Sequence, residues 1–472
     1  MKPTIAIAGA TGFIGRWFIH RFKDQYRFIG LTRREMLIEE PDPDVEWRQV
    51  EMYSLSSVTE ALTGADYALY LVHSMNPSTR LQQGSFEDTD LLLADNFARA
   101  AEAQGLKQIV FVGGLLPQDR EDFSRHLRSR YEVECTLGAR RTPLTSLRAG
   151  IIVGPGGSSF RIMEKLVAKL PLMIAPKWTN SQTHPIALDD MLKMIQLVLG
   201  NEDYFGEAYD VGQREVTTYA DMLRTVAELM GKKRWIIPVP VFSLNLSKLW
   251  VATIAESSST LVSPLVESLR HELSLRPNQL MDQFPKTINF REAARQALEG
   301  KGGYPSLPPN RKTITEKNTV RSVQRLPNPL GKTAEWVARR YQTWLPSLFR
   351  YLLTAKHSGD HTVFQVAGFP LLKLQFVKDR SDDDRQLFFV VDGRLVKRKD
   401  YGWLEFRRVL DGKYVISAIH EFVPTLPWYV YVVSQALAHV WVMRRFGRYL
   451  THLKGGEQKD TVAVGEVESS NR

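Results

Sequence analysis

The stretch Thr4–Gly15, which reads TIAIAGATGFIG, decides the fold of the first part of the chain. Its first five residues form a short β-rich run, and glycines follow at Gly9, Gly12 and Gly15, directly before a helical pattern over Phe13–Phe22. Glycines at this spacing let the backbone turn tightly and approach a pyrophosphate, whose negative charge is stabilised by the helix N-terminus. The order of strand, glycine loop and helix therefore predicts a dinucleotide-binding site.

The pattern around this loop alternates β-rich runs with helical stretches such as Leu91–Ala103, as in parallel sheets built from βαβ units. We expect strands at Thr4–Ala8, Tyr26–Thr32, Val45–Val50, Tyr67–His73, Ile109–Gly113 and Leu144–Arg148. Residues 1–150 are predicted to form a Rossmann-type, doubly wound α/β core. Residues 151–300, which prolines break into shorter elements, are predicted to form a small cap and substrate region at the carboxyl edge of its sheet.

Past residue 300 a Gly-, Pro- and Lys-rich segment, residues 301–325, is interpreted as a linker, and the hydrophobic period then changes to 2. The dipeptides Asp392-Gly393 and Asp411-Gly412 are typical of tight hairpins. We expect antiparallel strands at His361–Ala367, Leu371–Lys378, Gln386–Val391, Arg394–Lys397, Gly402–Val409 and Lys413–Phe422.

One long apolar stretch, Trp428–Met443, predicts a single helix after these strands. Residues 326–453 are therefore predicted to form an α+β domain, an antiparallel sheet plus a long C-terminal helix. Residues 454–472 are polar and are expected to be a disordered tail.

Composition and charge bound the class of protein. With 43% hydrophobic and 24% charged residues in 472, the chain is neither disordered, collagen-like nor a coiled coil. A single cysteine, Cys135, excludes an intrachain disulfide, and Met1–Ala8 lacks signal-peptide architecture. We therefore expect a cytoplasmic protein, and peripheral attachment to a membrane is the alternative. The net charge of +10 is uneven, since residues 1–300 carry −2 and residues 301–472 carry +12.

The end of the second predicted strand bears on the choice of dinucleotide. Arg33 and Arg34 stand where an NAD-selective site carries an acidic residue that holds the ribose 2′-hydroxyl. Two arginines pair well with a 2′-phosphate, so NADP(H) is favoured over NAD(H). The alternative interpretation is a solvated basic loop.

Several further stretches resemble the atypical short-chain dehydrogenase/reductases, and among these the NmrA-like or epimerase-like bacterial branch with a C-terminal extension. They are Tyr70–Met75, Phe86–Asp90, Asn96–Ala98, Phe111–Leu115, His126–Arg130, Leu147–Gly154 and Pro185–Asp190. The resemblance covers about residues 1–290 and, more loosely, about 340–450. It implies an NAD(P)-binding Rossmann core with a substrate cleft between core and cap.

Candidate site residues follow from the glycine loop and from this resemblance. We expect cofactor contacts from Gly9, Thr11, Gly12, Phe13, Ile14, Gly15, Arg33, Arg34, Leu71 and His73. We expect the substrate pocket to include Met75, Gly114 and His184. No spacing of His, Cys or Asp predicts a metal site.

The catalytic residues of the superfamily are incomplete in this chain. Active members pair a Tyr with a Lys four residues on, because the ammonium lowers the pKa of the phenol. The Tyr of the corresponding helix is Tyr131, but Cys135 stands in place of the Lys. The Ser or Thr that usually closes the fifth strand is also absent, since Gly113 and Gly114 stand there. Tyr131 and His73 remain as candidate proton donors, although a histidine at a strand end also serves structural roles.

The C-terminal module resembles the helix-grip architecture of START-like, ligand-binding domains, mainly through Gly402–Phe406 and His420–Pro424. We favour a core helix for Trp428–Met443, which is too short an apolar run to span a membrane. Its aromatic residues precede three arginines, Arg444, Arg445 and Arg448, so weak attachment to an anionic membrane surface stays open. The strands carry no stacking-aromatic motif, so no nucleic-acid partner is expected.

These observations predict an NADP(H)-dependent oxidoreductase of the atypical short-chain type that acts on a small apolar molecule. The alternative is a non-catalytic NADP(H)-binding sensor or scaffold protein, which the missing Tyr–Lys pair favours. The sequence leaves the substrate and the oligomeric state open.

Overall fold

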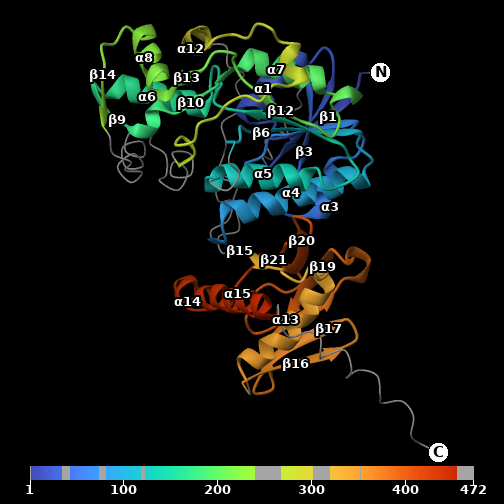
Figure 1. Cartoon of the computed structure of the whole chain (residues 1–472). Helices are drawn as coiled ribbons and strands as arrows, with labels where there is room; N and C mark the ends of the chain where they lie inside the picture. The colour runs from blue at the N-terminus through green and yellow to red at the C-terminus, as the bar shows by residue number, and fades with distance from the viewer. Residues whose placement is uncertain are drawn as a thin grey trace, which may run out of the picture. The chain divides into compact units, whose positions relative to one another are not determined.

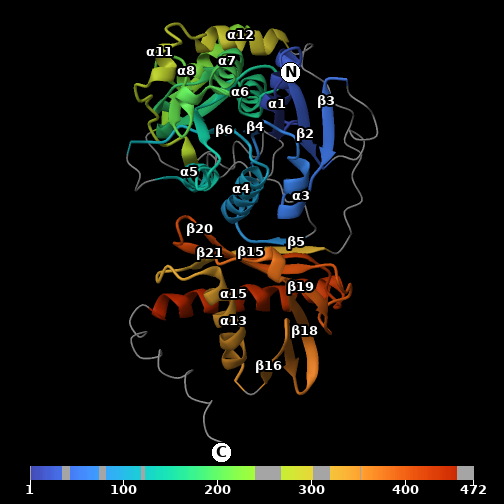
Figure 2. The same cartoon turned by 90° about the vertical axis from the view of Figure 1, so that its right-hand side faces the viewer.

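The computed structural model describes residues 2–33, 43–73, 81–118, 123–239, 267–300, 319–350 and 352–453 (Figures 1 and 2). Contacts divide the chain into two compact units. Unit 1 comprises Met1–Asn76 and Leu93–Thr313, and unit 2 comprises Pro77–Leu92 and Ile314–Arg472. The chain therefore enters unit 2 briefly, returns to unit 1, and enters unit 2 again, an interleaving that the sequence pattern does not predict.

Unit 1 is built on a seven-stranded sheet in the order β12-β7-β6-β4-β1-β2-β3, and its neighbouring pairs are parallel. Its central strands are apolar because both faces of a parallel sheet are covered, as the fully buried neighbours Ile5 and Ala6 on opposite faces show. The strands are β1 (Thr4–Ala8), β2 (Arg27–Thr32), β3 (Val45–Gln49), β4 (Tyr67–Tyr70), β6 (Gln108–Gly114), β7 (Leu144–Ala149) and β12 (Ala208–Val211). The predicted Rossmann-type sheet is confirmed, although its edge strand β12 lies beyond residue 150 in the sequence.

Helices cover both faces of this sheet. Figure 1 shows α1 and α7 on one face and α3, α4 and α5 on the other. In the core, the rings of Phe18 and Phe22 on α1 lie 4.8 Å apart. The elements are α1 (Phe13–Phe22), α3 (Leu55–Ala61), α4 (Phe86–Ala103), α5 (Arg125–Leu137), α7 (Leu188–Val198), η2 (Glu202–Tyr204) and α11 (Gln279–Asp282).

A second hydrophobic cluster in unit 1 forms the cap. It joins α6, α8 and α12 around buried residues such as Phe160, Val226 and Ala294. Three two-stranded pairs, β8–β11, β10–β13 and β9–β14, complete it. Its elements are β8 (Ile152–Val153), α6 (Ser158–Lys169), β9 (Leu172–Pro176), η1 (Lys177–Asn180), β10 (Gln182–Thr183), β11 (Ile186–Ala187), β13 (Thr217–Thr218), α8 (Tyr219–Leu229), β14 (Trp235–Val239) and α12 (Phe290–Glu299).

Unit 2 is an eight-stranded sheet in the order β16-β17-β18-β19-β20-β21-β15-β5. Its pairs are antiparallel except β15–β5, which is parallel. Helix α13 contacts β16, β19 and β20, and α15 contacts β15. The elements are β5 (Leu81–Gln83), β15 (Val320–Pro327), α13 (Ala334–Leu348), β16 (Leu353–Ser358), β17 (His361–Val366), β18 (Phe369–Phe376), η4 (Lys378–Arg380), β19 (Arg385–Asp392), β20 (Trp403–Val409), β21 (Tyr414–Phe422), α14 (Trp428–Val433) and α15 (Gln435–His452).

Three predictions for this unit are wrong in detail. The linker predicted over residues 301–325 ends before Val320, because residues 320–327 pair with β21 as strand β15. The predicted strand Arg394–Lys397 lies in the connection between β19 and β20, with only an isolated bridge at Val396. Asp392-Gly393 is not a tight hairpin because β20 starts at Trp403, whereas Asp411-Gly412 does turn β20 into β21, with left-handed φ of 54° and 79°.

The predicted single helix over Trp428–Met443 is two helices. Helix α14 ends at Val433 and α15 begins at Gln435, because Ser434 has φ −123° and ψ −86°, outside the helical region. An antiparallel sheet with a C-terminal helix is confirmed, and the likeness to START-like domains stays a prediction. Of the helices that the structure describes, none is long and apolar enough to cross a membrane. The predicted tail over residues 454–472 lies outside the described residues.

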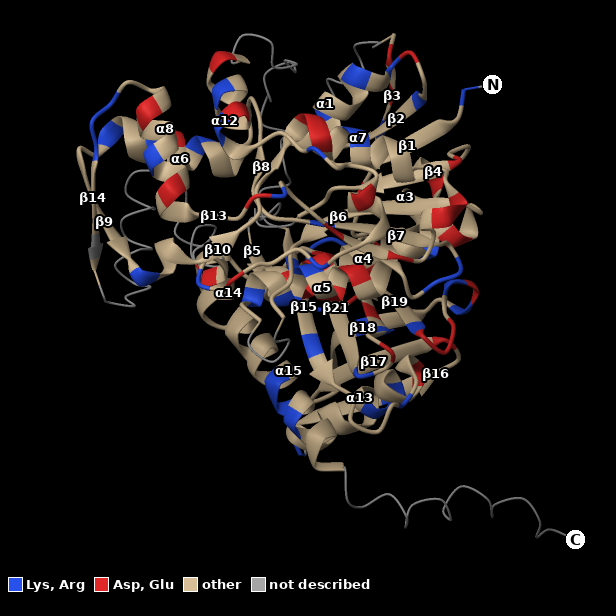
Figure 3. Cartoon of the chain, turned by 45° about the horizontal axis from the view of Figure 1, so that its top comes forward, with Lys and Arg blue, Asp and Glu red and all other residues tan. Residues whose placement is uncertain are grey.

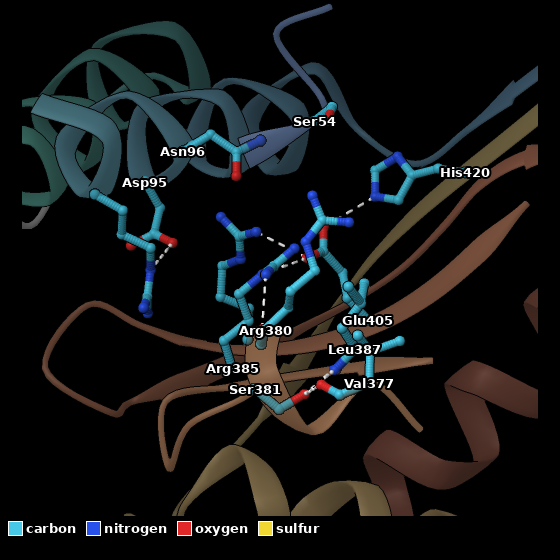
Figure 4. A network of polar contacts seen from close by, with 12 residues as sticks. Ser54, Asp95, Asn96, Val377, Arg380, Ser381, Arg385, Leu387, Glu405 and His420 are labelled. Atoms are coloured by element: carbon cyan, nitrogen blue, oxygen red, sulfur yellow. Dashed lines mark hydrogen bonds and ion pairs between the residues drawn. The ribbon is translucent and has the colours of Figure 1, made fainter. Parts of the chain in front are cut away.

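A buried ion-pair cluster holds the middle of this sheet together (Figure 4). The Glu405 carboxylate on β20 accepts hydrogen bonds from Arg385 Nε at 3.0 Å and Arg407 Nη2 at 2.8 Å, and its Oε1 lies 3.0 Å from His420 Nε2. The His420 ring stacks on Trp403 at 4.8 Å. Three adjacent strands are thus joined through one carboxylate.

Candidate cofactor and substrate site

The glycine loop between β1 and α1 has no room for side chains at Gly9 and Gly15. Gly9 has φ +98°, and a Cβ there would lie 3.0 Å from Leu71 Cβ. A Cβ on Gly15 would come within 2.5 Å of Gly9 O and 2.8 Å of Ala10 Cα. The Gly12 amide donates to Gly9 O at 2.9 Å, which closes the turn. The result is an exposed backbone cradle at the N-terminus of α1, the arrangement that fits a pyrophosphate.

The other predicted cofactor residues surround this loop in part. Leu71 follows β4 and its amide donates to Ala8 O at 2.8 Å, beside the loop. Arg33 is exposed at the carboxyl end of β2. Thr11, Phe13 and Ile14 are partly buried within the loop and the first turn of α1. Arg34 and Met75 lie outside the described residues.

A cavity of about 340 Å³ lies at the carboxyl ends of β6 and β7, where ligands of open α/β sheets bind. Gly114 and Ala149, from the ends of these strands, line it, and so does Phe13 from the end of the glycine loop. Most of its wall is apolar, and the cap helices α6 and α8 supply Ile162, Met163, Leu166 and Leu223. Its polar side chains are His126, Ser158, Ser159, Tyr219 and Ser268.

His126 is the polar group of this cavity that sequence analysis did not select. It lies in the first turn of α5, and its Nδ1 is 3.2 Å from His73 Nε2, with the two rings 5.1 Å apart. The predicted residue His73, just after β4, is therefore joined to the cavity through His126. Ser124 caps α5 by accepting from the Leu127 amide.

Spacing along α5 could have revealed this histidine. The superfamily places a cation four residues after its proton donor, and Arg130 stands four residues after His126. Arg130 is buried, donates to Val72 O at 3.1 Å and Val112 O at 2.9 Å, and lies over the Phe111 ring at 4.7 Å. It thus fixes the ends of β4 and β6.

Tyr131 is not among the residues that line the cavity. Its ring packs edge-on against Phe123, with centroids 5.9 Å apart. The same part of α5 is anchored by Glu134, which accepts from Ser146 Oγ at 2.6 Å and from Arg148 Nε at 2.9 Å. Burial alone would lower the pKa of Arg148, but the hydrogen bond to Glu134 and the charges of Glu134, Asp210 and Tyr131 together raise the pKa. This region therefore serves the packing of α5 on the sheet.

His184, which was expected in the substrate pocket, is surrounded by packing and hydrogen-bonding contacts within unit 1. Its side chain is buried and its Nδ1 lies 2.9 Å from Gln213 O. Its carbonyl oxygen lies against two glycines, since a Cβ on Gly150 or Gly212 would come within 2.9 Å or 2.7 Å of it. His184 is not among the residues that line the cavity.

Within the described ranges, no group of three or more His, Cys, Asp or Glu side chains could hold a metal ion. Tyr219 is the phenol of the cavity, and burial raises its pKa to about 12. It is therefore a neutral hydrogen-bonding group at physiological pH. The cavity pairs a largely apolar wall with one imidazole.

Comparison with known proteins agrees with the geometry of the loop. Residues 9–165 match a family model described as NAD(P)H-binding. This part of the chain is an NAD(P)H-binding domain. Among curated proteins, the auxiliary protein GraX of Staphylococcus aureus (strain NCTC 8325 / PS 47) is 27% identical over 146 residues. The match covers 30% of this chain and 43% of GraX, so the chain spans less than half the length of that relative.

Three solved structures each match 62% of the chain. They include a nucleoside-diphosphate-sugar epimerase from Staphylococcus aureus, at 17% identity, TM-score 0.49 and 99% of its own chain. The Citrobacter sp. triphenylmethane reductase complexed with NADP(H) is 18% identical, with TM-score 0.48 over 99% of its chain. The NADPH-dependent quinone oxidoreductase of Escherichia coli complexed with NADPH is 17% identical, with TM-score 0.49 over 99% of its chain.

Proposed function

We propose that the chain is an NADP(H)-dependent oxidoreductase of the atypical short-chain type, acting on a small apolar molecule in the cavity of unit 1. The observation that carries this proposal is the placement of His126, an imidazole on the wall of a largely apolar cavity. Phe13, at the end of the glycine loop, lines the same cavity. Such a cavity takes an apolar ligand and offers it one group that exchanges protons near neutral pH.

The cofactor would be held by the glycine loop, with the pyrophosphate against the amides at the start of α1. Arg33, exposed at the end of β2, would pair with a 2′-phosphate. When bound, NADPH supplies the hydride of the reaction. The remaining requirement, a proton at the substrate, falls to the side chains of the cavity.

His126 is the proposed proton donor and acceptor. Since its Nδ1 is engaged by His73, we expect Nε2 to be the nitrogen that exchanges a proton with the substrate. His73 is a positioning residue, because it contacts His126 and orients the ring. Arg130 stands four residues after His126, and its hydrogen bonds to Val72 O and Val112 O keep that end of the site rigid.

The test is NADPH consumption with a panel of quinones, enones and carbonyl lipids. General acid catalysis contributes about 10²- to 10⁴-fold, so His126→Ala should lower kcat by about that factor while leaving NADPH affinity unchanged. His73→Ala should lower kcat less and shift the pH profile, whereas a purely structural residue would leave the profile in place. Equal rates for His126→Ala and the parent would refute the proposed donor.

A second candidate is a non-catalytic NADP(H) sensor. The observation in its favour is that Cys135, which is exposed, stands four residues after Tyr131 in place of the superfamily's lysine. This candidate predicts tight NADPH binding without turnover on any member of the panel. Turnover that depends on His126 would exclude it.

A further inference from the structure

The outer faces of α14 and α15 in unit 2 expose large apolar side chains at every fourth residue. Tyr429 and Val433 on α14 are 75% and 69% exposed, and Leu437 and Trp441 on α15 are 61% and 45% exposed. Residues four apart lie on the same face of a helix, so Tyr429 and Val433 share a face of α14, and Leu437 and Trp441 share a face of α15. We call these four residues the apolar stripe. Exposed apolar surface of this extent marks an interaction site.

The opposite faces of the two helices already have their partners. Tyr431, Ala436, Val442, Met443, Phe446 and Leu450 are buried in the hydrophobic core of unit 2. The core-helix interpretation of the sequence describes these faces and leaves the apolar stripe unexplained. Folding of unit 2 therefore does not require the stripe to be apolar.

The charges around the stripe have one sign. Arg444, Arg445 and Arg448 are exposed on the turns that follow Trp441, and the Arg445 guanidinium lies 5.4 Å from the Trp441 ring. Residues 422–456 contain no Asp or Glu. In Figure 3 the ribbon of α15 accordingly carries blue segments toward its C-terminal end and no red.

A neighbouring segment extends the apolar surface. Phe349, at the end of α13, is 36% exposed, and its ring lies 6.3 Å from that of Trp441. Leu352, three residues on, is 69% exposed. Two separate segments of unit 2 thus contribute apolar side chains to one surface.

We propose that this face docks on an anionic lipid bilayer. Tryptophan and tyrosine beside arginine suit the headgroup layer, where the rings enter the acyl boundary and the guanidinium groups meet phosphates. The absence of any carboxylate over residues 422–456 matches a negatively charged surface, and the +12 charge of residues 301–472 adds to the attraction. This inference does not depend on the proposed function of unit 1.

Co-sedimentation of the full-length protein with lipid vesicles tests the proposal. The parent should bind vesicles of phosphatidylcholine with about 30% phosphatidylglycerol, bind pure phosphatidylcholine far less, and be released by salt. Replacing Arg444, Arg445 and Arg448 by Gln should weaken binding about a hundredfold, since each arginine near the surface contributes about 1 kcal/mol, or about fivefold. Leu437→Gln with Trp441→Gln should abolish binding without changing the Tm by more than a few degrees.

Trp235→Gln is the matched control. Trp235 is 73% exposed and follows three basic residues, Lys232, Lys233 and Arg234. It is thus also an exposed tryptophan beside positive charges, but it lies in unit 1 and outside the apolar stripe. This variant should sediment with vesicles like the parent.

Three outcomes would overturn the proposal. A parent that stays in the supernatant at low salt would show that the face does not meet lipid. Loss of vesicle binding in Trp235→Gln, with binding retained in the variants of the apolar stripe, would show that the lipid contact lies outside the stripe. A parent dimer that Leu437→Gln converts to a monomer would show that a second copy covers the stripe.

Discussion

The two sheets of this protein place their polar groups differently. In the parallel sheet of unit 1, strands β1 and β4 are apolar and buried, and the polar groups of the proposed site, His73 and His126, lie beyond the strand ends. In the largely antiparallel sheet of unit 2, Glu405 and Arg407 lie in the middle of a strand, fully buried.

This difference indicates where each sheet accommodates polar residues. The central strands β1 and β4, which helices cover on both faces, carry no charged residue, and binding and chemistry in such sheets belong to the carboxyl edge. A charge within a strand must be compensated on neighbouring strands, as Glu405 is by Arg385 and His420. We therefore expect substitutions of the polar residues beyond the strand ends of unit 1 to alter binding. Substitutions in the Glu405 cluster of unit 2 should alter stability.

The largest effect is expected for Glu405→Gln. Removing one partner from a buried ion pair leaves the other charge uncompensated, which costs about 3–5 kcal/mol of unfolding free energy. Urea denaturation measures this loss. Glu335→Gln is the control, because its exposed ion pair with Arg339 contributes less than about 1 kcal/mol. Equal losses in the two variants would contradict the assignment of the cluster as structural.

The same cluster predicts a dependence on pH. Burial alone would raise the pKa of Glu405, but Arg407, Arg385 and His420 hold the pKa well below its ordinary value. A depressed pKa stabilises the fold above the unfolded pKa of about 4.3, and this contribution is lost as the pH falls through the folded value. The unfolding free energy of the parent should therefore fall on acidification more steeply than that of Glu405→Gln.

The next effect concerns the carboxyl edge of unit 1. A Cβ on Gly12 would lie 3.0 Å from Gly9 O, and the larger valine would also fill the cradle. Gly12→Val should weaken NADPH binding at least about a hundredfold, or about 2.7 kcal/mol, measured by fluorescence titration. Gly64→Asn, at a turn where φ is +79° and nothing lies within 4 Å of a Cβ, should leave affinity unchanged, because Asn tolerates this left-handed backbone. Unchanged affinity in Gly12→Val would show that the loop does not hold the cofactor.

A smaller effect is expected at the end of β2. The parent should bind NADPH at least about tenfold tighter than NADH, which corresponds to about 1.4 kcal/mol. Arg33→Ser should reduce this preference by lowering NADPH affinity only, as calorimetry with both dinucleotides would show. Arg27→Ser, at the opposite, exposed end of the same strand, should preserve it. A parent that binds the two dinucleotides equally would remove the argument for NADP(H).

The smallest effect is expected for Tyr131→Phe. Because Tyr131 packs against Phe123 away from the cavity wall, its hydroxyl should contribute less than about threefold to kcat, or about 0.7 kcal/mol. Steady-state rates beside those of His126→Ala measure the contrast. A larger loss in Tyr131→Phe than in His126→Ala would reverse the two roles.

The local sequence pattern was sufficient to predict the six strands of the unit 1 sheet that lie before residue 150. Thr4–Ala8 and Phe13–Phe22 were predicted with the bounds that the structure shows, because strands buried on both faces are continuous apolar runs and the glycine loop marks their junction with the helix. The loop itself belongs to the same short stretch of sequence. The glycine loop that we propose for the cofactor was thus predictable from local sequence.

What sequence analysis missed depends on contacts between distant residues. Strand β5 is only three residues long, and it is a strand because it pairs with β15. The partnership of His73 with His126 joins a strand end to a helix 53 positions later. The break at Ser434 lies within an apolar run that continues on both sides, so hydrophobicity does not reveal it.

The short strand β5 also bears on biosynthesis. Its partner β15 begins about 240 residues later in the sequence, since Leu81 pairs with Val320. At about 5–20 residues per second, a ribosome needs about 12–48 s to make the intervening chain. During that interval most of unit 1 has been synthesised, while residues 81–83 still lack the strand with which they pair. A chain truncated after residue 300 would keep this strand without a partner, so unit 1 is better produced with unit 2 than alone.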